Sequence, residues 1–149
     1  MGRLPYVNSF RDLLVYQKSR QLSQAIFEIS KQFPKEEIYS LTDQIRRSSR
    51  SIGAQVAEAW AKRRYEKHFL SKLTDADGEQ QETQHWLETA VDCQYLTKEK
   101  ASWLLADCEE IGRLIGGMMN KTDTFCRSNT LRESVPEYFI TPNKPNTEY

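Results

Sequence analysis

The chain has 149 residues with a formal net charge of zero; 38% of them are hydrophobic and 28% are charged. This size predicts one domain that buries its own core without metals or disulfides. No apolar run reaches the length of a membrane span, residues 1–8 lack the apolar core of a signal peptide, and the three cysteines lack CxxC spacing. We therefore expect a cytoplasmic protein with reduced thiols that does not associate with membranes.

Apolar residues recur at helical spacing through the first half of the chain. The spacing predicts a helix over 10–33 that begins after Ser9 and is ended by Pro34. A second helix is predicted over 41–63, with Ser40 as its N-cap. At 100° per residue, the positions within about 60° of Ile45 form its core stripe, and three arginines lie on the far side. The stripe contains Leu41, Ile45, Ser48, Ser49, Ile52, Val56 and Ala59.

The second half of the chain predicts two more helices, over 66–96 and 98–122, with Thr97 as the N-cap of the later one. After Phe125 the apolar pattern stops, and three prolines stand among polar residues. The interpretation is an all-α, antiparallel, up-down four-helix bundle over 1–125, followed by a flexible polar tail over 126–149. Short links between the helices favour this topology because they make consecutive helices antiparallel neighbours.

The net charge of zero conceals an asymmetry. Residues 1–64 hold 12 Lys and Arg against 6 Asp and Glu, a net of +6, and residues 65–125 hold 6 against 12, a net of −6. A charge split of this kind points either to a nucleic-acid partner or to another copy of the same chain.

Basic residues in and after the second helix form the candidate nucleic-acid site, because arginines bind phosphates through bidentate hydrogen bonds. Arg46 and Arg50 share one face, from which Lys62 and Arg63 wind away. The alternative is a solvated helix face with a charged helix end, which the neutral net charge favours, since nucleic-acid-binding domains commonly have a high pI. The candidate residues are Arg46, Arg47, Arg50, Lys62, Arg63 and Arg64.

Small residues on the non-core side of the second helix form a candidate seam for a second copy of the chain. Helix propensity alone would explain the alanines, but glycine within a helix costs about 1 kcal/mol relative to alanine. Trp60 and Trp86 would add apolar contact. Acidic residues of the third helix are the expected counterparts of the arginines. The seam is Gly53, Ala54, Ala57 and Ala61, and the acidic counterparts are Asp75, Glu79 and Glu82.

Polar residues interrupt the apolar stripe of the third helix at Asp77, Gln80 and Gln84. If the chain reverses near residue 64, Gln80 lies level with Ser48, and Gln84 lies level with Gln44. One interpretation is a buried hydrogen-bonded layer that fixes register; the other is a ligand site. The sequence has no H-E-x-x-H motif, no E-x-x-H pair and no glycine-rich phosphate loop. We therefore predict no catalytic residues, no metal and no cofactor.

Several motifs together resemble a known family. Phe10, Asp12, Leu13 and Val15 match an F-x-D-L-x-V stretch, Phe33-Pro34 ends a helix, and Gln44-Ile45-Arg46-Arg47 precedes Ser51-Ile52. The third helix adds Ala76, Gly78, Glu82, Leu87, Ala90, Tyr95 and Leu96. Over roughly 10–119 the chain resembles the four-helix bundle proteins of intervening sequences in bacterial large-subunit ribosomal RNA genes. It departs from their N-I-A-E-G element, which here ends in Ala59.

That family is similar in turn to the accessory variability determinant of diversity-generating retroelements, a ring-shaped pentamer that works with nucleic acid and a reverse transcriptase. The resemblance therefore implies a cyclic homo-oligomer, a pentamer, with RNA or DNA as ligand and a reverse transcriptase as partner. We expect a non-enzymatic accessory protein that binds nucleic acid through its second helix. The alternative is a scaffold protein whose basic and acidic faces serve only self-assembly and protein partners.

Overall fold

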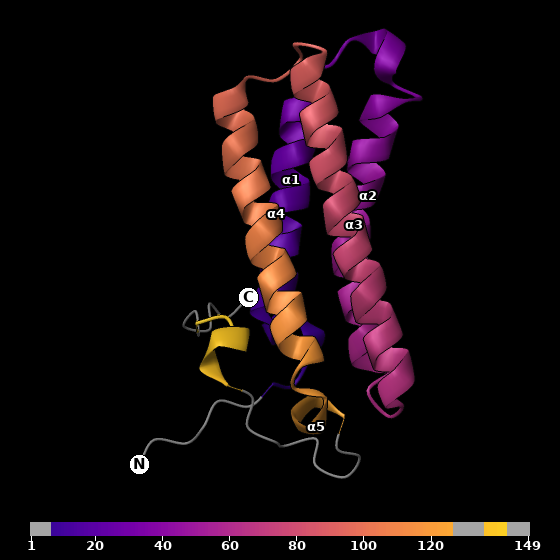
Figure 1. Cartoon of the computed structure of the whole chain (residues 1–149), viewed down its shortest axis with the longest axis vertical. Coiled ribbons are helices and arrows are strands. Elements are labelled where there is room, and N and C mark those ends of the chain that lie inside the picture. The colour runs from indigo at the N-terminus through magenta and orange to yellow at the C-terminus, as the bar shows by residue number, and fades with distance from the viewer. Residues whose placement is uncertain (1–6, 127–135, 143–149) are drawn as a thin grey trace, which may run out of the picture.

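The computed structural model describes residues 7–126 and 136–142. Four long helices form an antiparallel up-down bundle, which confirms the predicted fold class (Figure 1). The long helices are α1 (Leu14–Ser30), α2 (Leu41–Ala61), α3 (Glu66–Asp92) and α4 (Lys98–Met119). The short ones are η1 (Phe10–Asp12), η2 (Lys35–Glu37), α5 (Thr122–Phe125) and η3 (Glu137–Phe139).

Each long helix packs against its neighbours in sequence, and α4 closes the bundle against α1. The most extensive contact joins α2 and α3, and α1 meets α4 over a smaller one. Consequently α2 and α4 lie at diagonal corners of the bundle. The starts of α2 and α4 lie at one end of the molecule, and the turn between α2 and α3 lies at the other (Figure 1).

The predicted core stripe of α2 is buried. Ile45, Ile52 and Val56 have no exposed surface, and they pack with apolar residues from all four long helices. Ser48 and Ser49, which belong to the same stripe, are also fully buried. The helical period therefore identified the inward face of α2 correctly, polar members included.

The first helix begins and ends differently from the prediction. Ser9 and Asp12 form the expected capping box, but it caps η1. Leu13 is extended and interrupts the helix, so α1 begins at Leu14. At the other end α1 stops at Ser30 rather than Phe33. Phe33 is instead buried in the core beside the ring of Tyr95, with 5.8 Å between ring centroids.

The predicted side-chain cap of α2 is wrong, and that of α4 is confirmed. Ser40 holds the N-cap position but makes no capping bond; Glu37 accepts the backbone N–H of Leu41 at 3.1 Å and the Ser40 hydroxyl at 2.9 Å. Thr97 accepts the backbone N–H of Lys100 at 3.2 Å. The predicted helices are also a few residues too long at their C-termini, since α2 ends at Ala61, α3 at Asp92 and α4 at Met119.

Residues 136–142, predicted as part of a flexible tail, pack on the bundle. Phe139 is 1% exposed and its ring lies 5.5 Å from that of Phe125. Ile140 forms an antiparallel bridge with Leu13, and the backbone N–H of Thr141 donates to the carbonyl of Asp12 at 2.9 Å. The rest of the predicted tail, apart from Cys126, lies outside the described residues.

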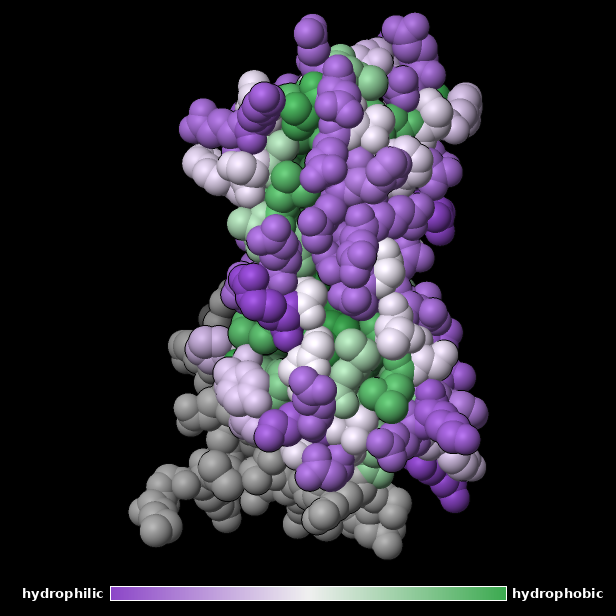
Figure 2. All heavy atoms as spheres, viewed as in Figure 1, coloured by the Kyte–Doolittle hydropathy of each residue, from purple (hydrophilic) through white to green (hydrophobic). Residues whose placement is uncertain are grey.

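Hydrophilic side chains cover much of the middle of the face formed by α3 and α4, with apolar atoms visible between them (Figure 2). Among the helices that the structure describes, none combines the length and apolar character that crossing a bilayer requires.

Candidate nucleic-acid interface

The six basic residues predicted as one site form two separate groups. Arg46, Arg47 and Arg50 lie near the start of α2, whereas residues 62–64 follow its last turn. The 12 residues from Arg50 to Lys62 correspond to roughly 18 Å along the axis at about 1.5 Å per residue. The structure therefore agrees with the helical period, which placed Lys62 and Arg63 away from the face of Arg46 and Arg50.

The first group lines a groove with a volume of 590 Å³ on the outer side of α2. Two apolar residues from the link before α2 border it: Tyr39 is 92% exposed and Ile38 is 50% exposed. We call this surface the α2 groove, defined by Ile38, Tyr39, Asp43, Arg46, Arg47 and Arg50.

Contacts with α1 hold two arginines of the α2 groove in place. The Nε of Arg46 donates to the Ser30 hydroxyl at 2.8 Å. The guanidinium carbons of Arg46 and Arg50 lie 4.8 and 5.5 Å from the centre of the Phe27 ring, within cation–π range. These two guanidinium groups pair with no carboxylate in the described chain, so they remain available to an anion.

The second group, which we call the turn patch, comprises Lys62, Arg63, Arg64 and Tyr65 between α2 and α3. Lys62 and Arg64 are exposed, and Tyr65 is 58% exposed. Arg63 is half-buried with its guanidinium carbon 3.4 Å from the centre of the Trp60 ring, and its Nε donates to the Trp60 carbonyl at 2.8 Å. Burial lowers the pKa of Arg63 below its ordinary value. The patch thus combines positive charge with an accessible aromatic ring.

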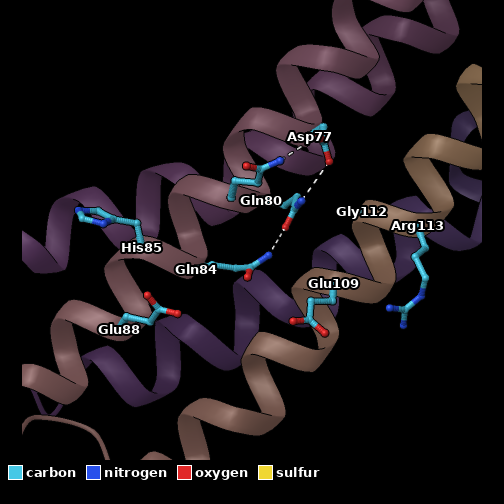
Figure 3. A pocket seen from close by; sticks show the side chains of 9 residues that line it. Asp77, Gln80, Gln84, His85, Glu88, Glu109, Gly112 and Arg113 are labelled. Atoms are coloured by element: carbon cyan, nitrogen blue, oxygen red, sulfur yellow. Dashed lines mark hydrogen bonds between the residues drawn. The ribbon is translucent and has the colours of Figure 1, made fainter.

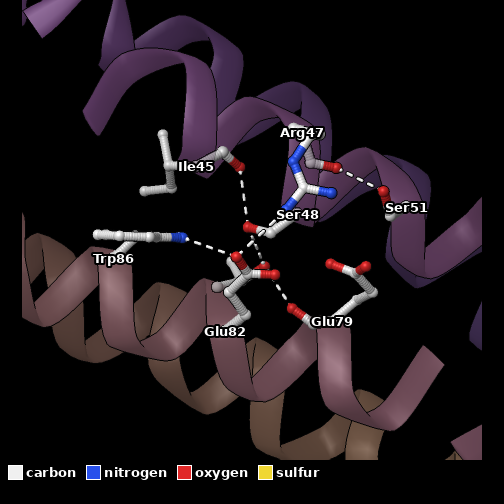
Figure 4. A network of polar contacts seen from close by, with 8 residues as sticks. Ile45, Arg47, Ser48, Ser51, Glu79, Glu82 and Trp86 are labelled. Carbon is white, nitrogen blue, oxygen red and sulfur yellow. Dashed lines mark hydrogen bonds and ion pairs between the residues drawn. The ribbon is translucent and has the colours of Figure 1, made fainter. Parts of the chain in front are cut away.

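The third arginine of the α2 groove belongs to a polar network between α2 and α3 (Figure 4). Arg47 forms an ion pair with Glu82 at 3.3 Å, and the indole N–H of Trp86 donates to the same carboxylate at 3.3 Å. Glu79 lies beside them, and burial together with the neighbouring Glu82 raises its pKa above the ordinary value. Two residues predicted as intermolecular contacts, Glu82 and Trp86, therefore already serve contacts within the chain, and Glu79 is partly buried beside them.

The small-residue seam is not a continuous free track, because its glycine faces α1. Gly53 is buried, and a Cβ there would lie 3.7 Å from Tyr16 and Ser19. Ala57 is half-buried, while Ala54 and Ala61 are exposed. The predicted seam fails at Gly53, since its position in the helical period lies closer to the α1–α2 contact than to the outer face.

Substitutions at Gly53 test its packing against α1 directly. A Cβ there would meet its neighbours at ordinary van der Waals distance, so Gly53→Ala should stabilise the protein by up to about 1 kcal/mol through helix propensity. Gly53→Leu should destabilise it by about 1–3 kcal/mol, because the longer side chain would overpack the Tyr16 contact. Thermal melts of both variants measure the difference. Equal stability of the two variants would mean that this face of α2 is open.

The exposed aromatic residues are not the ones that the sequence suggested. Trp60 and Trp86 are half-buried against the core, whereas Trp103 on α4 is 69% exposed. Tyr39 was missed because it stands in a link, outside any helical period. For Trp103 the signal was present but weak: it lies off the α4 stripe that contains Leu104 and Cys108.

The polar interruption of α3 forms a hydrogen-bonded chain along that helix (Figure 3). Gln80 donates to Asp77 at 3.0 Å and accepts from Gln84 at 2.7 Å. The predicted bond across to Ser48 is made by Thr83 instead, at 2.9 Å. The chain reverses about one and a half residues later than expected, which shifts the pairing with α2 by three residues.

Gln80 faces α4 because Gly112 leaves room for it: a Cβ at Gly112 would lie 2.9 Å from the Gln80 amide nitrogen. A shallow groove with a volume of 520 Å³ lies over this chain between α3 and α4, with Glu109 and Arg113 on its α4 side. The amide and carboxylate partners satisfy one another, so the arrangement is that of a structural layer.

The cysteine thiols that the structure describes are buried to different degrees. Burial raises the pKa of Cys108 to about 12 and also raises that of Cys126, which keeps both thiols protonated at neutral pH. Within residues 7–126 and 136–142, no group of three His, Cys, Asp or Glu side chains is placed to hold a metal ion.

Comparison with known proteins identifies the family. The model of the 23S rRNA-intervening sequence proteins matches residues 11–117. The chain belongs to this family. A crystal structure from Bacteroides thetaiotaomicron VPI-5482, of a protein with unknown function in the S23 ribosomal protein family, is similar. The two sequences are 30% identical and the two structures superpose with a TM-score of 0.66. The match covers 72% of this chain and 96% of the Bacteroides chain. No curated protein matches.

Family membership agrees with the resemblance carried by the motifs of α1, α2 and α3. The matched region ends at Gly117, within α4, so it includes the α2 groove and the turn patch but not the docked segment 136–142. Ligand, partner and assembly are matters for proposal.

Proposed function

We propose that the protein is a non-enzymatic, homo-oligomeric helical bundle that binds RNA or DNA through the basic residues that directly follow α2. The observation that carries this proposal is the turn patch. Lys62 and Arg64 are exposed beside the accessible ring of Tyr65, and none of the ion pairs in the described chain involves them. Positive charge for phosphates and an aromatic face for bases are what single-stranded nucleic acid requires.

Oligomerisation would strengthen such a site. Two or three cationic side chains per chain give weak binding, but copies in a ring would place their turn patches along one rim and bind one strand together. The family resemblance implies a pentamer, and a reverse transcriptase is the protein partner it implies. The family's name refers to 23S rRNA, which makes single-stranded RNA the first probe to use.

A scaffold that binds only proteins is the second candidate. It is favoured by the neutral net charge and by the Arg47–Glu82 ion pair, which shows basic and acidic faces of this fold satisfying each other. In that case the turn patch is a solvated helix end. The two candidates differ in one observable, which is salt-dependent binding to nucleic acid.

Binding of a fluorescent single-stranded RNA, measured by anisotropy from about 20 to 200 mM salt, tests the proposal. If each chain contacts three phosphates, log K should fall with log salt at a slope of about −2 for every chain that one strand contacts, since each phosphate on a single strand contributes about −0.7. Lys62→Glu with Arg64→Glu should reduce this slope to about −0.7 for every chain contacted. Arg63 is left intact because it packs on Trp60.

A charge-matched control separates the site from general electrostatics. Arg20→Glu with Lys31→Glu makes the same change in net charge at two exposed positions, one in α1 and one directly after it. This control should keep the slope of the unmodified protein. Absence of RNA and DNA binding at the lowest salt would reject nucleic acid as the ligand and leave the scaffold candidate.

A further inference from the structure

The most exposed tryptophan of the described chain lies on an acidic surface. Trp103 is 69% exposed on α4. Residues three, four and seven positions away on a helix share its surface; the charged ones here are Glu99, Lys100, Asp107 and Glu110. Because Glu110 pairs with Lys18 of α1, the other three leave a net charge of −1. A large exposed aromatic ring is costly to leave in water and is typical of interface centres.

The α2 groove has the opposite character. Because Arg47 pairs with Glu82, its other charged residues Asp43, Arg46 and Arg50 sum to +1, and Tyr39 borders them with 92% of its surface exposed. Trp, Tyr and Arg are the residue types that dominate binding energy at protein interfaces. The groove can accept an indole ring between guanidinium groups, where cation–π contacts add to burial.

We infer that Trp103 of one copy docks in the α2 groove of the next copy. The acidic residues around the indole then meet the arginines around the groove, and the complementary charges set the orientation of the contact. This inference rests on the oligomeric part of the proposed function and identifies its interface. It also replaces the predicted counterparts Glu79 and Glu82, because Glu82 pairs with Arg47 of the same chain and Glu79 is partly buried beside that pair.

The positions of the two surfaces suit a closed ring. Arg46 and Trp103 each lie five residues into their helix, about 7.5 Å from helix starts at the same end of the bundle (Figure 1). Their helices occupy diagonal corners, so neighbouring copies would stand side by side and parallel. Trp103 shares its side of α4 with Glu110, which pairs with Lys18 of α1 at 3.1 Å.

That ion pair shows that the Trp103 surface is turned toward α1 rather than away from the bundle. The two contact surfaces are therefore at an angle to each other instead of back to back. A heterologous contact of this kind rotates each copy relative to the last, and repetition closes a ring when the rotation suits. The turn patches of all copies then lie on the same rim, away from the contact.

Complementation between two variants tests the inference. Trp103→Ser keeps an intact groove, and Tyr39→Ser with Arg50→Glu keeps an intact Trp103 surface. By light scattering at micromolar concentration, each variant alone should be monomeric at 17.4 kDa, whereas the unmodified protein should show several times that mass. An equal mixture of the two variants should form a dimer of twice the chain mass, because one intact contact remains. Tyr65→Ser, which removes an exposed ring at the other end, should leave the mass of the oligomer unchanged.

The outcomes separate this inference from the proposed function. An oligomer whose mass is unchanged in both interface variants would overturn the Trp103 contact and leave oligomerisation standing. Monomeric variants that give no dimer on mixing would also overturn it, because the contact would then not join these two surfaces. A monomeric unmodified protein would overturn the inference and the oligomeric part of the proposed function together. RNA binding is tested separately, by the dependence of the binding constant on salt.

Discussion

Replacing Ile52 with aspartate is expected to unfold the protein. Ile52 lies at the centre of the α2 stripe with no exposed surface, and apolar residues of the core surround it. A carboxylate there would lose its hydration without gaining a partner, at a cost of about 5 kcal/mol. That cost is comparable to the whole free energy of unfolding of a domain this size. Loss of the far-UV helical signal at 25 °C is the measurement.

Arg50→Ala is the matched control on the same helix. Arg50 is exposed, and its contact with the described chain is the Phe27 ring at 5.5 Å. The expected loss is below about 1 kcal/mol, the usual cost of removing one exposed cation–π contact. Equal destabilisation by both variants would mean that the inward and outward faces of α2 are exchanged.

Phe139→Ala should detach residues 136–142 from the bundle. The ring is 1% exposed beside Phe125, and it lies so close to α4 that a Cβ on Gly117 would be 3.1 Å from it. Removing a buried phenylalanine ring commonly costs about 3 kcal/mol or more, and two backbone contacts at Leu13 and Asp12 cannot replace it. Limited proteolysis followed by mass spectrometry should show early cleavage between residues 136 and 142.

Tyr138→Ala provides the comparison, because Tyr138 is 54% exposed on the same short helix. Its protease sensitivity between 136 and 142 should stay close to that of the unmodified protein. If Phe139→Ala and the unmodified protein are cleaved between residues 136 and 142 at the same rate, the Phe139 ring does not hold this segment on the bundle.

The sequence predicted the helices well and their ends poorly. Helical periodicity located the buried face of α2, including Ser48 and Ser49, because amphipathic spacing reflects burial directly. The ends depend on local competition that spacing does not reveal. Glu37 caps α2 in place of Ser40, and Phe33 leaves the helix for the core. A reversal centred a little later than residue 64 was enough to replace Gln80 with Thr83 as the partner of Ser48.

For the candidate site, the separation of the basic residues could be predicted but their partners could not. The helical period already placed Lys62 and Arg63 away from the face of Arg46 and Arg50, and the length of α2 puts them on different surfaces. Glu82 was predicted to meet arginines of another copy, but it pairs with Arg47 of the same chain. The exposed fraction of a side chain depends on tertiary packing. Tyr39 and Trp103 therefore became clear candidates only with the structure.

The bond between Thr141 and Asp12 has a consequence for synthesis on the ribosome. The two residues are 129 positions apart, and at roughly 5–20 residues per second the later one emerges on the order of ten seconds after the earlier. During that interval α1, α2 and α3 can already pair, whereas the place on α4 and Leu13 that Phe139 and Ile140 will cover stays open. The C-terminal segment is thus the last piece to be added, and a nascent chain stalled before residue 136 would display an apolar surface that the finished protein hides.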